Sequence, residues 1–279
     1  MNNYYRPFGG FSVFPKVIKN LLIINAAVFF VQVIANNLMV GGKPLWYILN
    51  YWFALNPLAE DFNFQVWQLI TYQFMHGSFT HILFNMFALW MFGMEIENYW
   101  GTKKFLTYYL LCGVVAGLFQ LFLTPLLGSS AAVTIGASGA VYGVLIAFGL
   151  MFPNRLIFLY FLIPVKAKYL IGFLIVLEFM LVDSAQSNVA HLAHLGGALA
   201  GLLFILLFYF VTGIGKVDPV RYSGAFFKNG AGMFFTVTGM VFISYGGLTK
   251  VVDVAGEVKN PKKNLPLGML MAFLIVNFL

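Results

Sequence analysis

Three apolar stretches of the sequence carry polar residues whose types, taken together, suit acyl transfer. Ser138 lies within GASGAVYG and His194 within HLAHLGG. A neutral histidine that accepts the proton of a serine hydroxyl is the minimal activated nucleophile for such a reaction. His81 and Asn85 are spaced at i and i+4, so on a helix they share one face and both can donate to a developing oxyanion, with the backbone N–H of Ser138 as a third donor. The residue types predict a Ser138–His194 dyad.

The composition indicates which elements hold these residues. Of the 279 residues, 61% are hydrophobic and 9% are charged, against about 25% charged in a soluble domain. This excludes a soluble globule and a disordered chain, and apolar runs of about twenty residues predict an all-α polytopic membrane protein. The single cysteine, Cys112, excludes an intramolecular disulfide. LIFLYFLIP, before the fifth span, is expected to be extended or interfacial. Six spans are expected, at residues 17–38, 80–97, 104–123, 135–152, 168–182 and 191–211.

Basic residues set the expected orientation. With the N-terminus in the cytoplasm, Lys43 is the one basic residue placed outside before residue 229. The second, fourth and sixth spans then run from outside to inside, so their first turns gather at the outer face together with all four histidines. Basic residues scattered between apolar runs argue against nucleic-acid binding. No cleavage site follows the first run, so it is expected to remain as an anchor, in a bacterial cell membrane. The residues placed inside are Arg6, Lys16, Lys19, Lys103, Lys104, Arg155, Lys166, Lys168, Lys216, Arg221 and Lys228.

The same orientation turns residues 39–75 into a long outer loop. Trp46, Trp52 and Trp67 within it suit an amphipathic structure lying at the level of the lipid headgroups. This loop is expected to lie beside the first turns that carry the polar residues.

Small residues are expected to bring the fourth and sixth spans together. Gly139 and Gly143 lie beside Ser138, and Gly197 and Gly201 follow His194, which allows a close approach of the two backbones. The alternative interpretation of Ser138 is a small residue packed in a helix interface, and that of each histidine is a hydrogen-bonded residue of the bundle. Complementary groups on three spans at one side of the membrane favour the dyad.

A zinc site is the weaker alternative, because four histidines share a face and His191 precedes His194 by three residues. No HExxH helix is present and these helix starts carry no Asp or Glu, so no metal and no cofactor is expected. Glu178 is the remaining charge within the spans. It is expected to be a snorkelling or capped structural residue near the outer end of the fifth span, with a gate as the alternative.

These residues resemble the rhomboid family of intramembrane serine proteases over about residues 16–215. HGSFTHILFNMFALWMFG is similar to the family's second-helix signature, GASG to its nucleophile motif, and AHLGGALAG to its sixth-helix motif. The resemblance implies a six-helix core, no cofactor, and cleavage of membrane-anchored substrates. It implies Ser138 as the nucleophile, His194 as the general base, and His81 and Asn85 as oxyanion donors.

The resemblance also implies two supporting roles and contains one departure. Tyr142 supplies a ring that supports the histidine, and Gly136 shapes the oxyanion loop. The family's Trp-Arg pair in the outer loop is Trp67-Gln68 in this sequence, which removes the charge that usually anchors the loop.

The C-terminal part is foreign to that pattern, because residues 231–279 look like a fragment of an amino-acid permease. A transporter needs two inverted multi-helix halves, so transport by this chain alone is not expected. If residues 232–248 spanned the membrane, the lysines that follow would lie outside, against the positive-inside rule. A gene fusion, an assembly artefact and a failed insertion each explain this. The predicted organisation is a protease core over residues 1–215, a junction over 216–230, and a permease-like fragment over 231–279 that has no function alone.

The predicted function is that of an intramembrane serine endopeptidase, which cleaves a transmembrane or juxtamembrane peptide bond with water from the outer face. The alternative from another class is a non-catalytic protein that binds transmembrane helices, and the presence of both Ser138 and His194 argues against it. A role in amino-acid transport rests on the C-terminal segment only. The expected partners are membrane-anchored substrates and the lipid bilayer.

Overall fold

The computed structural model describes residues 11–59, 62–127, 132–159, 162–182 and 190–214. The chain divides into two units, Met1–Thr212 and Gly213–Leu279. The expectations for the junction at 216–230 and for the permease-like fragment at 231–279 lie outside the described residues.

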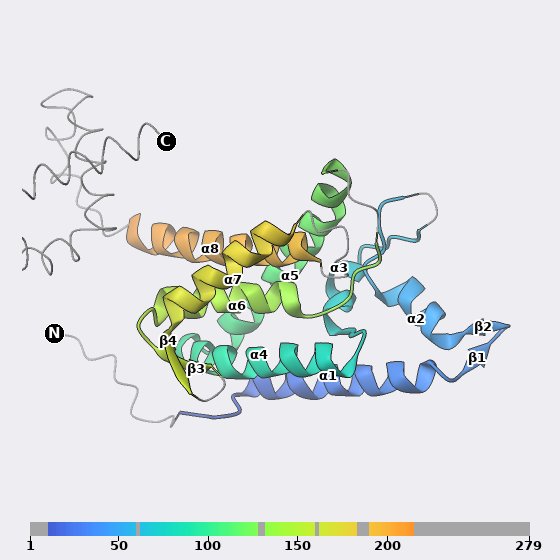
Figure 1. Cartoon of the computed structure of the whole chain (residues 1–279), viewed down its shortest axis with the longest axis horizontal. Coiled ribbons are helices and arrows are strands. Elements are labelled where there is room, and N and C mark those ends of the chain that lie inside the picture. The colour runs from blue at the N-terminus through green and yellow to red at the C-terminus, as the bar shows by residue number, and fades with distance from the viewer. Residues whose placement is uncertain (1–10, 60–61, 128–131, 160–161, 183–189, 215–279) are drawn as a thin grey trace, which may run out of the picture. The chain divides into compact units, whose positions relative to one another are not determined.

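Helices occupy all six places expected from the sequence, with ends shifted by a few residues. Among the described residues, four helices are long and apolar enough to cross a membrane, whereas α6 has 14 residues and α7 has 15. The chain is an all-α polytopic membrane protein, and α4, α6 and α8 begin at the same end of it (Figure 1). The six helices are α1 (Lys16–Ala35), α4 (Phe79–Trp100), α5 (Thr102–Leu126), α6 (Ser138–Met151), α7 (Ala167–Leu181) and α8 (His191–Ile214).

Helix α6 lies at the centre of this arrangement, because it contacts α4, α5 and α7. Most of its residues are buried, and Val144 packs in one cluster with Leu89 of α4 and Phe105 of α5. Large apolar side chains such as Phe30 of α1 and Phe84 of α4 remain exposed. Exposed apolar surface of this kind suits contact with lipid.

Local signals at both ends of α4 determine where it begins and ends. The Ser78 side chain accepts the N–H of His81 at 3.1 Å and so caps the first turn. Gly101, with φ at 82°, ends the helix and allows α5 to begin directly afterwards. The sequence before and after the second span therefore fixes the register in which His81 and Asn85 are presented.

A carboxylate of α4 caps the start of α1. Glu97 is buried, and its two oxygens accept the N–H groups of Val17 at 2.8 Å and Ile18 at 2.9 Å. The hydroxyl of Thr102 donates to the same side chain at 3.3 Å. Because the first N–H groups of a helix have no partner within it, this contact both satisfies α1 and ties it to α4.

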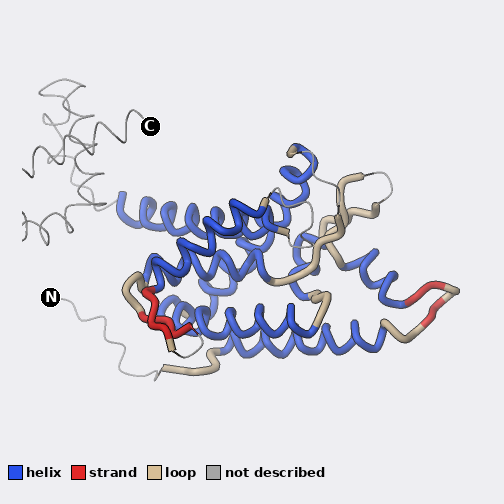
Figure 2. The backbone as a smooth tube through the Cα atoms, in the orientation of Figure 1, coloured by secondary structure: helices blue, strands red, loops and turns tan. Residues whose placement is uncertain are grey.

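Short elements fill the connections between the helices. The strand β3 (Leu156–Leu159) pairs antiparallel with β4 (Ile163–Lys166), which confirms the expected extended structure before the fifth span. Figure 2 shows this hairpin and the pair formed by β1 (Met39–Val40) and β2 (Lys43–Pro44) at opposite ends of the helices. The loop over residues 39–75, which keeps its name of outer loop from the expected orientation, also contains α2 (Leu45–Phe53), α3 (Gln68–Thr71) and the 3-10 helix η1 (Tyr72–Phe74).

The tryptophans of the outer loop are exposed to a similar extent. Trp46, Trp52 and Trp67 have exposed fractions of 43%, 44% and 46%. The rings of Trp52 and Trp67 stack with centroids 6.2 Å apart, and Nε1 of Trp67 donates to the Trp52 carbonyl at 2.9 Å. Exposed indole rings of this kind are what a location among the headgroups requires, and that location stays a prediction.

Gln68, which stands where the family's Trp-Arg pair has its arginine, anchors the loop. Gln68 is fully buried, and its Oε1 accepts the N–H groups of Asn56 at 3.1 Å and Gln65 at 3.2 Å. Its Nε2 donates to the carbonyls of Tyr51 and Asn63, each at 3.0 Å. One amide side chain thus joins three separate stretches of the loop without a charge.

Candidate active site

The segment ahead of Ser138 is held in a conformation that only glycine adopts readily. Gly136 has φ at 128°, and its N–H donates to the Tyr72 carbonyl at 2.9 Å. Helix α6 therefore begins at Ser138. The span expected over residues 135–152 thus begins three residues later than expected, because the positive φ of Gly136 interrupts the helix. Ser138 lies in the first turn, where backbone N–H groups have no partner within the helix.

The outer loop fixes the position of this segment. Leu55 and Thr134 form an antiparallel bridge, with N–H to carbonyl distances of 3.0 and 2.9 Å. The Tyr72 hydroxyl in turn donates to the Gly113 carbonyl of α5 at 2.7 Å. Leu55 and Tyr72 could not be predicted from the sequence, because backbone pairing between distant segments leaves no signal in residue type.

Ser138 and His194 meet across the contact between α6 and α8. The Ser138 Oγ lies 2.7 Å from the His194 Nε2. The ring of Tyr142 stacks on that of His194 with centroids 4.6 Å apart and planes 12° apart. His194 is 7% exposed and Ser138 is partly buried. If Nε2 accepts the hydroxyl proton, the imidazole must carry its own proton on Nδ1.

Glycines allow this meeting by bringing the two backbones into contact. A Cβ atom on Gly197 would fall on the Gly139 carbonyl oxygen, and a Cβ atom on Gly201 would lie 3.0 Å from the Cα of Gly143. The expected close approach of the fourth and sixth spans is therefore present. The two small-residue pairs place the first turn of α6 directly against the first turns of α8.

The residues expected to bind an oxyanion lie on the α4 side of the serine. A Cβ atom on Gly136 would come within 2.8 Å of the His81 Cε1 and Nε2 atoms. The Gly77 N–H donates to His81 Nδ1 across a long 3.5 Å contact, an arrangement in which Nδ1 is the acceptor. Asn85 is buried on the same helix, and its Nδ2 has no hydrogen-bond partner among the described residues. The Asn85 amide thus has a donor that is free to bind an anion, and a proton on Nε2 would give His81 a second donor beside it.

A third histidine, His76, packs beside His81 before α4 begins. Its ring centroid is 5.0 Å from that of His81. The backbone N–H of His76 donates to the Gln32 Oε1 at 3.0 Å. Burial, together with the neighbouring His81, lowers the pKa of His76 to about 4. His76 is therefore neutral at pH 7 and adds no charge to the oxyanion side.

Glu178 of α7 belongs to the site, although the sequence predicted a different environment for it. It is 7% exposed, so the snorkelling half of the expectation is wrong, whereas the other half, a capped residue, agrees with its contacts. Its Oε1 lies 3.0 Å from Nδ1 of His194 and accepts the Tyr142 hydroxyl, and its Oε2 lies 2.5 Å from Nδ1 of His191. The available signal was a carboxylate within a span, which is costly in lipid and so points to a specific set of partners.

Glu178 and the two histidines that it contacts form a candidate metal centre. Glu178, His191 and His194 each offer one ligand atom, and these atoms lie within 4.8 Å of one another. Two histidines and one glutamate are a ligand set that zinc accepts. The acidic ligand is Glu178, near the end of α7, since the starts of the second, fourth and sixth spans carry no Asp or Glu.

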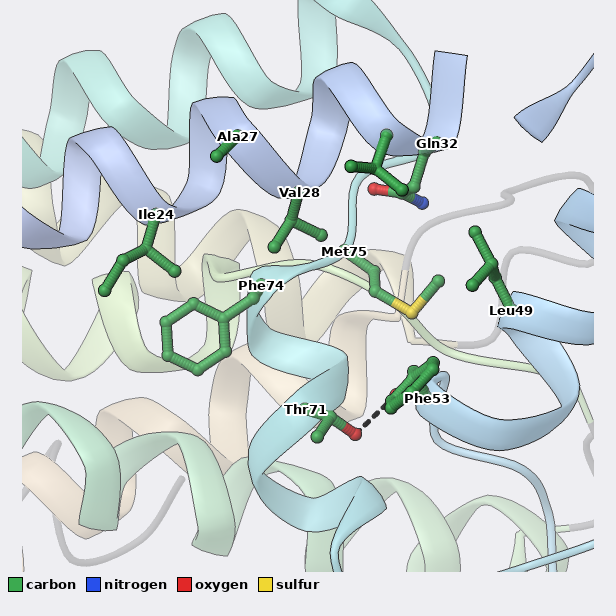
Figure 3. A pocket seen from close by; sticks show the side chains of 10 residues that line it. Ile24, Ala27, Val28, Gln32, Leu49, Phe53, Thr71, Phe74 and Met75 are labelled. Atoms are coloured by element: carbon green, nitrogen blue, oxygen red, sulfur yellow. Dashed lines mark hydrogen bonds between the residues drawn. The ribbon is translucent and has the colours of Figure 1, made fainter. Parts of the chain in front are cut away.

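The cavity of about 440 Å³ in Figure 3 lies apart from these residues. It is bounded by Ile24 and Val28 of α1, Leu49 of α2 and Phe74 of η1, and its lining is almost wholly apolar. The Thr71 hydroxyl on its wall donates to the Phe53 carbonyl at 2.7 Å. None of the predicted site residues lines this cavity, so the candidate active site is defined by its side-chain contacts.

The fold and the site together define an integral membrane protein with a partly buried serine in contact with a buried histidine between two of its helices. A family model described as the Rhomboid domain matches residues 63–211, and the chain belongs to the rhomboid family. A second family model, Amino acid permease, matches residues 162–279. That match begins earlier than the expected residue 231 and overlaps the rhomboid match in α7 and α8.

Several rhomboid proteins are similar in sequence. Rhomboid protein 1, mitochondrial, of Saccharomyces cerevisiae is 32% identical over 206 residues, which cover 71% of this chain and 55% of the relative. RHOMBOID-like protein 12, mitochondrial, of Arabidopsis thaliana is 31% identical over 199 residues, covering 65% and 55%. Rhomboid protease AarA of Providencia stuartii is 26% identical over 217 residues, covering 68% and 72%. The chain spans about half the length of the first two relatives.

Proposed function

We propose that the chain is an intramembrane serine endopeptidase that cleaves membrane-anchored proteins within or beside a transmembrane helix. The observation that carries the proposal is the 2.7 Å distance between Ser138 Oγ and His194 Nε2. Relatives named as proteases support it, among them the one from Providencia stuartii. Substrates whose helices are easily unwound are favoured, because a helical peptide bond is shielded and hydrogen-bonded.

In the proposed mechanism Ser138 Oγ attacks the carbonyl carbon of the scissile bond while His194 Nε2 takes its proton. The negative charge that develops on the carbonyl oxygen is stabilised by His81, Asn85 and the Ser138 N–H. His194 then gives its proton to the leaving amine, and water hydrolyses the acyl-enzyme by the reverse transfers. Stacking on Tyr142 keeps the imidazole in position throughout.

The proposal includes the orientation and the two-part organisation of the chain. We place the N-terminus in the cytoplasm of a bacterial cell, because this puts the basic residues inside. The relatives named as mitochondrial make an organelle membrane the alternative, which fractionation of the source cells distinguishes. The protease core at 1–215 and the permease-like segment at 231–279 are proposed as separate parts, supported by a division of the chain near residue 212.

Labelling by a serine-directed fluorophosphonate tests the proposal together with cleavage of a model transmembrane substrate. The wild-type protein is expected to be labelled and to cleave, and Ser138→Ala and His194→Ala are each expected to abolish cleavage while the protein stays folded in detergent. Turnover by either variant at a rate close to the wild type would refute the dyad. Binding of the substrate helix without labelling or cleavage would instead support a non-catalytic helix-binding protein.

A metal-dependent hydrolase is a second candidate, favoured by the cluster of Glu178, His191 and His194. The serine mechanism and the metal-dependent mechanism differ in their response to a chelator, because the serine mechanism needs no metal. EDTA is expected to leave cleavage by the wild-type protein unchanged. Loss of activity in EDTA that added zinc restores would favour the metal mechanism.

A further inference from the structure

The carboxylate of Glu178 contacts the catalytic pair on the side away from the serine. Its Oε1 lies 3.0 Å from Nδ1 of His194, whose Nε2 is the atom that faces Ser138. The ring N–H of His194 is not aligned with this oxygen in the free protein, as is common before substrate binds. The two ring nitrogens of His194 therefore face a hydroxyl and a carboxylate.

The position of this carboxylate is determined by contacts with two other helices. The Tyr142 hydroxyl of α6 donates to Oε1, and the His191 Nδ1 of α8 lies 2.5 Å from Oε2. The side chain of Glu178 is 10% exposed, so it is held among these groups and not in solvent. No Lys or Arg among the described residues forms an ion pair with it. Two imidazoles and a phenol are thus its partners, and one of those imidazoles is the proposed base.

We propose that Glu178 is a positioning residue that completes a Ser138–His194–Glu178 triad. This inference rests on the proposed protease activity and adds a third group to its dyad. A carboxylate at Nδ1 keeps the proton on that nitrogen, so that Nε2 is free to accept from Ser138. When the serine proton moves to Nε2, the imidazolium formed lies beside a negative charge that stabilises it. The proton then goes to the leaving amine, and Glu178 remains ionised throughout.

His191 and Tyr142 have a different task in this arrangement. Each contacts Glu178, and together they hold the carboxylate against His194. Loss of His191 leaves Oε1 and its contact with His194 in place. The effect of removing His191 is therefore expected to be much smaller than that of removing the charge of Glu178.

The test compares Glu178→Gln, Glu178→Asp and His191→Ala with the wild type on a model transmembrane substrate. The Gln variant keeps the size of the side chain and removes its charge, so kcat is expected to fall on the order of a hundredfold or more at little changed KM. The Asp variant keeps the charge farther away and is expected to lie between Gln and the wild type. His191→Ala is expected to keep substantial activity.

A matched control separates catalysis from stability. Glu97→Gln alters a buried carboxylate at the other end of α4, so it is expected to lower Tm without lowering the kcat of the folded fraction. A kcat of Glu178→Gln within threefold of the wild type would overturn the triad, and so would an equal loss in His191→Ala. If Glu178→Gln does not fold, Glu178→Asp takes its place as the test. A wild-type kcat in Glu178→Asp would then overturn the triad. Failure of the protease proposal can be told apart from failure of the triad, because in the first case the wild-type protein itself would not cleave the substrate.

Discussion

At the scale of single residues, Gly136 is the position where backbone conformation and side-chain space constrain each other most. Its φ of 128° disfavours any L side chain, and a Cβ atom there would press on the His81 ring at 2.8 Å. Gly136→Ala is therefore expected to displace His81 or the segment before Ser138 and to lower kcat/KM on the order of a hundredfold.

The control for this variant is Gly172→Ala, because a Cβ atom at Gly172 meets nothing within 4 Å. Cleavage of the model substrate by the two variants, at equal amounts of folded protein, is the measurement. Wild-type kcat/KM in Gly136→Ala would show that the segment adapts to a side chain and that Gly136 does not shape the site.

His76 gives a prediction about stability and pH. Its pKa is about 4 in the folded protein against 6.5 in the unfolded chain, so the unfolded chain binds more protons between these values. The stability contribution of neutral His76 is present above pH 6.5 and is lost as the pH falls towards 4. In thermal unfolding in detergent, Tm is expected to fall less from pH 7 to pH 4 in His76→Gln than in the wild type. Parallel Tm curves for the two proteins would contradict this.

At the scale of elements, the contact between α6 and α8 depends on the absence of side chains. A Cβ atom on Gly197 would overlap the Gly139 carbonyl oxygen, and helix backbones do not bend locally to make such room at low cost. Gly197→Ala is expected to separate the helices, to lower Tm, and to reduce labelling of Ser138 by fluorophosphonate. Gly213→Ala on the same helix meets nothing within 4 Å and is expected to behave as the wild type. Equal Tm and labelling in both variants would show that the contact is adaptable.

The cap that α4 provides for α1 leads to a prediction about stability alone. Glu97→Gln retains one acceptor for the first turn of α1 and loses the charge, so the free energy of unfolding is expected to fall by about 1–3 kcal/mol. Glu95→Gln is the control, since the ion pair of Glu95 with Arg155 at 2.8 Å lies near the surface, where such pairs contribute about 1 kcal/mol or less. Unfolding in detergent measures both, and an equal change in the two would remove the special role of the cap.

At the scale of the whole molecule, the described site draws every one of its side chains from the first unit of the chain. The packing of α6 against α8 uses the glycines of those helices themselves. Truncation after Gly215 is therefore expected to leave cleavage activity and thermal aggregation close to those of the full chain. If the truncated protein lost activity or aggregated at a markedly lower temperature, the C-terminal segment would have to be treated as part of the protease fold.

The sequence predicted the helices and the meeting of Ser138 with His194, because apolar length, glycine spacing and charge asymmetry are local or additive signals. It placed the start of α6 three residues early, since the positive φ of Gly136 comes from its bond to Tyr72, a partner far away in the chain. It also described Glu178 as a snorkelling or capped structural residue near the outer end of the fifth span, and not as a neighbour of His194. Which face of α7 packs against α8 depends on the packing of the whole bundle, and no periodicity within a 15-residue apolar helix reveals it.

The anchoring of the outer loop by Gln68 has a consequence for the solution conditions that the protein tolerates. A guanidinium or carboxylate anchor weakens as salt screens it or as the pH removes a partner's charge. The buried amide of Gln68 holds the carbonyls of Tyr51 and Asn63 and the N–H groups of Asn56 and Gln65 without any charge. The hold on this loop, and through Leu55 on the segment before Ser138, is thus independent of ionic strength.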